Sequence, residues 1–101
     1  MKQELMHTLD DIYFLLMSCN WPEKAKWFKE EITKIDELEP SSPDFYIELK
    51  SIQKIITGMG SFTDLPLYPK EDSGLTEKEA SNLQWELADR LGAEIKYIDG
   101  M

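Results

Sequence analysis

The chain of 101 residues carries twenty acidic side chains against eleven basic ones, which gives a formal net charge of −9. Such a charge repels nucleic acid and anionic membranes, so neither is an expected partner, whereas it attracts basic proteins over a Debye length of about 10 Å. The length fits one domain over residues 1–101, and the 42% of hydrophobic residues is typical of a packed globule and not of a disordered acidic tail.

The cysteine content and the start of the chain bear on its location. Cys19 is the only cysteine, which excludes an intrachain disulfide and gives no basis for a zinc cluster. Acidic residues interrupt the apolar ones near the start, so we expect no signal peptide, and no stretch approaches the roughly 18 apolar residues of a membrane span. These features predict a cytoplasmic protein.

Two helices are predicted in the first part of the chain. Apolar residues recur at helical spacing over residues 3–19 and again over residues 25–38. Asn20 stands three residues before Glu23, with Pro22 between them. We therefore expect Asn20 to cap the second helix in a capping box with Glu23.

A third helix is predicted from Ser42, a natural cap that is followed by Pro43 at the first helical position. Its apolar line continues to Ile56, and Gly58 is expected to end it in a left-handed conformation. Residues 58–68 lose the helical period, and we expect them to form an extended segment that lies over the bundle.

A fourth helix is predicted from the capping box of Thr76 and Glu79 to a stop at Gly92. Residues 93–98 then alternate apolar and charged side chains, which predicts a short strand, paired with part of residues 62–67. The sequence thus predicts a mainly all-α fold, a compact bundle of about four helices with an extended segment after the third helix and a short C-terminal strand.

The residues that could carry catalysis are few. His7 is the only histidine and lies among acids, so no nucleophile, base and orienting acid can be assembled around it. Cys19 near the end of a helix is interpreted as a small buried hydrophobic residue. We therefore expect no enzyme activity and no cofactor.

Metal binding is not expected either. The chain has several adjacent pairs of carboxylates, but neighbouring residues on a helix point about 100 degrees apart and cannot chelate one ion together. The spacing of a calcium loop is absent from the sequence. The pairs are Asp10 and Asp11, Glu30 and Glu31, Asp36 and Glu37, and Glu71 and Asp72.

Sites for phosphate groups are also weakly supported. Residues 58–61 contain two glycines but follow a helix and precede no lysine, unlike a phosphate-binding loop. The basic residues are scattered except for Lys24, Lys26 and Lys29, which are too few for nucleic acid on a net-acidic domain. No basic amphipathic face suits a membrane surface.

The acid-rich stretch 30–48 is the predicted docking surface for a basic protein. It holds seven acids against Lys34 alone, and several lie at the end of the second helix, where they oppose the helix dipole. Solubility alone is the alternative explanation, and a second acidic stretch over 71–94 competes with the first. The predicted partner-binding residues are Glu30, Glu31, Asp36, Glu37, Glu39, Asp44 and Glu48.

The stretch 58–65 carries the sequence Gly-Met-Gly-Ser-Phe-Thr-Asp-Leu. It resembles a family of small bacterial domains with a Gly-Met-Gly-Ser-x-Asn-Asp-Leu motif after a helix, from which Thr63 departs. The matching positions, with structural roles in a tight turn, are Gly58, Gly60, Ser61, Asp64 and Leu65. In size and acidity that family is similar to immunity proteins of contact-dependent and polymorphic toxin systems.

Charge and resemblance together favour an immunity protein that binds a basic toxin domain, such as a nuclease, through its acidic surface. The alternative is a structural or regulatory helical module that self-associates through Trp21, Trp27 or Trp85. The sequence does not fix the oligomeric state.

Overall fold

The computed structural model describes residues 2–40, 42–56 and 62–99. Within these ranges the chain forms four α-helices and two short 3-10 turns, and no strand is present. The mainly all-α bundle predicted from the sequence is thus confirmed. The elements are α1 (Lys2–Met17), α2 (Pro22–Glu37), α3 (Pro43–Ile56), η1 (Phe62–Asp64), η2 (Glu71–Ser73) and α4 (Glu77–Asp99).

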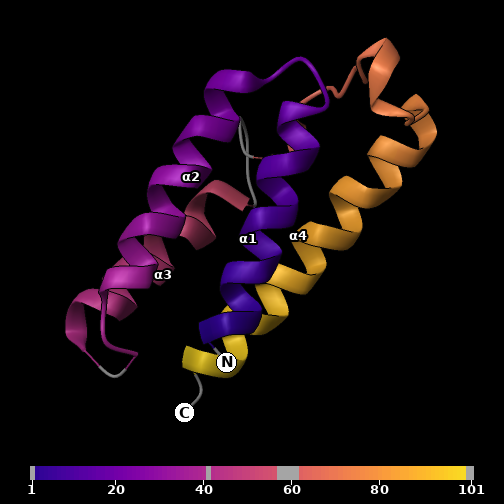
Figure 1. Ribbon diagram of the computed structural model, residues 1–101. Helices are drawn as coiled ribbons and strands as arrows, with labels where there is room; N and C mark the ends of the chain where they lie inside the picture. The colour runs from indigo at the N-terminus through magenta and orange to yellow at the C-terminus, as the bar shows by residue number, and fades with distance from the viewer. Residues whose placement is uncertain (1, 41, 57–61, 100–101) are drawn as a thin grey trace.

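The helices form a bundle in which α1 and α3 each pack against both α2 and α4. Successive helices alternate in direction, so the start of α1 and the end of α4 lie at the same end of the bundle (Figure 1). The turn from α2 to α3 lies at this end as well. The molecule measures 42 × 22 × 21 Å along its principal axes.

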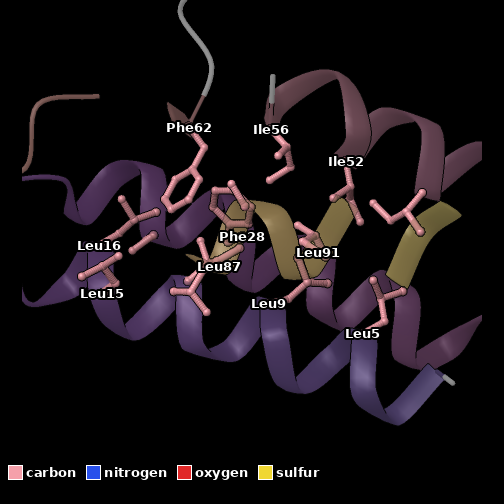
Figure 2. Close-up of a cluster of buried hydrophobic side chains, with 14 of the residues drawn as sticks. Leu5, Leu9, Leu15, Leu16, Phe28, Ile52, Ile56, Phe62, Leu87 and Leu91 are labelled. Atoms are coloured by element: carbon pink, nitrogen blue, oxygen red, sulfur yellow. The ribbon is translucent and has the colours of Figure 1, made fainter. Parts of the chain in front are cut away.

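The core is built from the apolar lines of all four helices, which converge as Figure 2 shows. Leu9 of α1, Ile52 of α3 and Leu91 of α4 are fully buried. Phe62 joins η1 to this core, and its ring meets that of Phe28 edge to face at 6.0 Å between centroids. Burial of each large apolar side chain contributes roughly 1.5 to 3 kcal/mol, which makes this core the main source of stability.

Two of the predicted helix starts are confirmed by their hydrogen bonds. The Ser42 hydroxyl accepts from the Phe45 N–H at 3.2 Å, with Pro43 at the first position of α3. At α4 the Thr76 hydroxyl accepts from the Glu79 N–H, and the Glu79 carboxylate accepts from the Thr76 N–H, both at 3.1 Å. This reciprocal pair is a complete capping box.

The predicted capping box of Asn20 and Glu23 is wrong. The residue before α2 is Trp21, and it forms no capping bond through its side chain. The Asn20 side chain instead accepts a hydrogen bond from the Tyr68 N–H at 3.0 Å, while the Trp21 indole donates to the Pro66 carbonyl at 2.8 Å. Both side chains therefore hold the segment after η1 against the turn between α1 and α2.

The predicted stop at Gly92 and the predicted strand over 93–98 are also wrong. Helix α4 continues through Gly92 to Asp99. Leu91, Ile95 and Ile98 are spaced by four and three residues and are all buried, so the same stretch satisfies helical periodicity. Burial of Ile95 and Ile98 outweighs the cost of about 1 kcal/mol for a glycine inside a helix.

Residues 65–70, between η1 and η2, have no regular structure, as predicted for the extended segment, but residues 62–64 of that segment form the 3-10 turn η1. Leu67 is buried, and the Lys70 N–H donates to the Ser18 carbonyl at 2.9 Å. The buried Gln84 amide donates to the carbonyls of Phe62 and Leu65, at 2.7 and 2.9 Å. These bonds fix the segment across one end of the bundle. Gly58, the predicted end of the third helix, lies outside the described residues.

Candidate functional site

The predicted partner-binding acids lie on α2, on α3 and on the turn between them. The antiparallel packing of the two helices brings the last turn of α2 beside the first turn of α3 (Figure 1). Glu48 is half-buried, and the exposed members of the set are Glu30, Asp36, Glu37, Glu39 and Asp44.

Glu31 does not share the exposure expected for a docking residue, because only 4% of its surface is accessible. It lies on the side of α2 that faces α3, where Glu48 contacts it. The prediction that Glu31 belongs to the exposed acidic surface is therefore wrong. The cause is the helical phase of α2, which places residue 31 beside Phe28 and Ile35 on the buried side.

A hollow of about 260 Å³ lies between α2 and α3 within this group of acids. Ile47 is one of its walls and is 60% exposed, although it is a large apolar residue. Ile47 points away from the core because the buried line of α3 passes through Phe45 and Leu49 instead. The residues that line the hollow are Lys34, Glu37, Leu38, Asp44, Ile47 and Glu48.

Glu31, Lys34 and Glu48 form a charged cluster behind this hollow. The Lys34 ammonium lies 3.3 Å from Oε1 of Glu31, while Oε2 of Glu31 is buried with no hydrogen-bond donor. Burial, together with the hydrogen bond to Glu48, raises the pKa of Glu31 to about 7, and Lys34 only partly opposes this. In return, Glu31 raises the pKa of Lys34.

Lys2 explains how the end of α2 tolerates its acids. The Lys2 ammonium donates to the main-chain carbonyls of Asp36 and Leu38, at 2.8 and 2.9 Å. A cation at this end offsets the partial negative charge of the helix dipole, which the side chains of Asp36 and Glu37 would otherwise reinforce. The two acidic side chains are exposed to solvent.

Only part of the Gly-Met-Gly-Ser stretch can be placed. Gly58, Gly60 and Ser61 lie outside the described residues, whereas Asp64 is exposed in η1 and Leu65 is half-buried. Leu65 lines an apolar groove of about 330 Å³ between α2, the end of α3 and η1. The other lining residues of this groove are Glu23, Lys24, Trp27, Phe28, Ile55 and Phe62.

The second acidic stretch differs from the first because two of its members hold the fold together. Glu79 completes the cap of α4, and the Glu94 carboxylate accepts from the Thr8 hydroxyl at 2.6 Å. Arg90 of α4 contributes to the same contact between helices, since it donates to Thr8 and pairs with Asp11. This stretch therefore contributes to the packing of α1 against α4.

The residues considered for catalysis are His7 and Cys19, and those considered for self-association are the three tryptophans. His7 is exposed on α1, and Cys19 is buried, which raises the pKa of its thiol and keeps it protonated. Trp21 and Trp27 are half-buried against the core, whereas Trp85 of α4 is 55% exposed.

Metal sites and membrane spans are both absent from the described part of the chain. Among the described residues, no cluster of three or more histidine, cysteine, aspartate or glutamate side chains is arranged to hold a metal ion. No helix in that part has both the length and the apolar character needed to cross a membrane.

Sequence reasoning missed Ile47, which is the apolar member of the candidate site. The sequence contained a signal for it, because Ile47 does not belong to the apolar line of Phe45, Leu49 and Ile52. It therefore lies on a different side of the helix from the residues that face the core. The hollow itself could not be foreseen, since it depends on how α2 and α3 pack.

No protein-family model, no curated protein and no solved structure matches this chain. The resemblance of residues 58–65 to the family of small bacterial domains therefore remains a prediction.

Proposed function

We propose that this domain binds a basic protein through the end of the bundle formed by α2 and α3. The observation that carries the proposal is the exposed Ile47 beside an acid-lined hollow. An apolar anchor inside a charged rim is the usual anatomy of a protein-binding surface. We name this region the α2–α3 acidic surface, and it consists of Ile47 with Glu30, Asp36, Glu37, Glu39, Asp44 and Glu48.

The two kinds of residue would act at different stages of binding. The net charge of −9 steers a basic partner toward the domain and raises the association rate, most strongly at low salt. Ile47 and the half-buried Leu38 then lose water against the partner, which slows dissociation. The proposed surface would thus provide both fast capture and retention of the partner.

The partner class that we favour is a toxin with a basic, phosphate-binding cleft, such as a nuclease. Carboxylates of the α2–α3 acidic surface would occupy the positions of substrate phosphates and so block the cleft. The domain would then act as an immunity protein in the cytoplasm of the cell that makes the toxin. The resemblance of residues 58–65 to domains of that character supports this choice.

Affinity capture followed by a protection assay tests this function. The tagged domain is incubated at low salt with a lysate of its source organism, and bound proteins are eluted with salt and identified by mass spectrometry. We expect a basic polypeptide in stoichiometric amount, whose expression alone arrests growth and whose co-expression with the domain does not. A captured partner that is acidic, or one whose toxicity the domain leaves unchanged, would contradict the proposal.

Self-association is the second candidate, because Trp85 is exposed on α4, a helix that contributes no residue to the α2–α3 acidic surface. Trp21 and Trp27, which were considered with it, are half-buried. Sedimentation at micromolar concentration separates the two functions. A dimer that Trp85→Ala dissolves, together with no affinity for any basic protein, would favour the self-associating module.

A further inference from the structure

We propose that the hollow between α2 and α3 is a subsite for the guanidinium group of a partner's arginine, and that its binding expels a proton from the buried Glu31 behind the hollow. This inference rests on the proposed function, since it specifies how the α2–α3 acidic surface recognises a basic partner. Three features of the hollow support it: its lining, the lysine already held there, and the unpartnered carboxylate oxygen behind it.

The lining suits the two parts of an arginine side chain. Glu37 belongs to α2, whereas Asp44 and Glu48 belong to α3, so carboxylates stand on both walls. The planar guanidinium presents five donors in a fixed fork that matches the geometry of carboxylates, whereas the three donors of a lysine ammonium have no such fixed arrangement. Leu38 and Ile47 offer apolar surface to the methylene groups of the arginine stem.

Lys34 shows that the site already accommodates a cation. Its ammonium contacts Glu31 while its side chain remains 56% exposed and lines the hollow. An exposed lysine in this geometry is held weakly and can turn outward, because solvent screens its attraction to the carboxylate. An incoming guanidinium can therefore take over the contacts with the carboxylates.

Glu31 is the group that would hold the proton. Its carboxyl group contacts Lys34 and Glu48, which both line the hollow, so the group lies directly behind that wall. Its Oε2 atom is buried without a donor, and Glu48 can offer it only an acceptor. A proton on Glu31 that is donated to the Glu48 carboxylate satisfies both groups.

Few charges act on this pair. Lys34 comes from the same helix as Glu31, and Glu48 comes from α3. From the other helix packed against α2, Lys2 of α1 reaches this end but is bonded to main-chain carbonyls. A guanidinium bound to Glu48 would offset the repulsion that Glu48 exerts on Glu31, so Glu31 would ionise and its proton would pass to the solvent.

Calorimetry with a synthetic hexa-arginine peptide tests the proposal. Titration at about pH 6.5 in two buffers of different ionisation enthalpy gives the number of protons released. We expect more than half a proton per bound peptide, because one arginine enters the hollow and Glu31 is mostly protonated at this pH. Between about pH 6 and 8 the affinity should rise roughly tenfold, since the proton no longer has to be displaced.

Glu31→Gln is the informative variant, and Glu86→Gln is its control, because Glu86 is exposed on α4 outside the α2–α3 acidic surface. Glu31→Gln should bind the peptide without releasing a proton and with no change in affinity over this pH range. Glu86→Gln should behave as the wild type does. Circular dichroism establishes that both variants are folded.

A second measurement needs no variant. Carbon-13 NMR of the glutamate carboxyl groups in the wild-type domain should show Glu31 titrating near neutral pH, and at least one pH unit lower with the peptide bound. An unmoved Glu31 titration would overturn the proposal even if Glu31→Gln failed to fold.

The outcomes separate this inference from the proposed function. Peptide binding without proton release, or with equal release by Glu31→Gln, would overturn the subsite and leave the α2–α3 acidic surface standing. Stronger binding of hexa-lysine than of hexa-arginine would overturn the preference for a guanidinium. No binding of either peptide at any pH would contradict the subsite and the basic partner together.

Discussion

At the scale of single residues, Glu31 links the stability of the domain to pH. Its pKa is about 7 in the folded state against an ordinary value of 4.5. A carboxyl group whose pKa is raised on folding binds more protons in the folded state, so its contribution to stability is fully present below pH 4.5 and is lost as pH rises through about 7. The affected window is therefore pH 4.5 to 7.

The substitution Glu31→Gln is expected to remove this loss of stability at high pH. A glutamine at this position keeps the shape of the side chain and can donate its amide hydrogens to Glu48 without carrying a charge. At about pH 8 the variant should be more stable than the wild type by on the order of 2 kcal/mol, and the difference should vanish near pH 5. Urea unfolding at both pH values measures this, with Glu30→Gln as the control. A constant difference between the two pH values would contradict the assignment.

Ile47 is the second residue with a distinct expected effect. It is 60% exposed, so Ile47→Ala should change the free energy of unfolding by less than about 0.5 kcal/mol. The same substitution should weaken binding of the captured partner tenfold or more, at a cost of about 1.4 kcal/mol or above, if Ile47 is its apolar anchor. Surface plasmon resonance gives the dissociation constant. An affinity within about twofold of the wild type would remove Ile47 from the site.

At the scale of elements, helix starts were predicted well where the signal is local. Ser42 and Thr76 each bond to a main-chain N–H three residues ahead, and the sequence shows that spacing directly. Asn20 offered the same local signal, but its side chain is used by Tyr68, which is 48 residues away in sequence. A contact of that kind depends on the tertiary fold and cannot be read from spacing.

The end of α4 shows a second limit of local reasoning. The stretch 93–98 fits an alternating pattern as well as a helical one, and Gly92 favoured a break between helix and strand. Packing decided the outcome, because only a continued helix buries Ile95 and Ile98 together with Leu91. Six residues are too few for periodicity to distinguish the two structures.

The substitution Gly92→Ala tests whether residue 92 lies inside a helix or in a left-handed helix stop. A β-carbon at this position would meet no atom within 4 Å, and the residue lies inside α4. Alanine should therefore raise the free energy of unfolding by about 0.5 to 1 kcal/mol, because glycine loses more backbone entropy in a helix. Thermal unfolding followed by circular dichroism measures the change. A loss of stability would indicate the left-handed stop that the sequence alone predicted.

At the scale of the whole molecule, the acidic residues fall into two groups with different roles. On α4, Glu79 and Glu94 bond within the fold. On the α2–α3 acidic surface, Asp36, Glu37 and Asp44 are exposed, and the end of α2 needs the Lys2 ammonium to offset its dipole. The sequence predicted this acidic region, and the helical phase of α2 separates its exposed acids from the buried Glu31. The hollow beside Ile47 depends on the packing of α2 on α3.

The most direct test of the account is the affinity of the captured partner for two charge-reversed variants of equal net charge. The first replaces Asp36, Glu37, Glu39 and Asp44 with lysine, and the second replaces Glu71, Asp72, Glu86 and Asp89, all of which are exposed in the second acidic stretch. Both should fold, because lysine is tolerated at exposed positions and is favourable at the end of α2.

We predict that the first variant loses at least about a hundredfold in affinity, while the second stays within about tenfold of the wild type because only the long-range attraction falls. Equal losses in the two variants would show that net charge alone attracts the partner. An unchanged affinity in the first variant would contradict the α2–α3 acidic surface as the binding site.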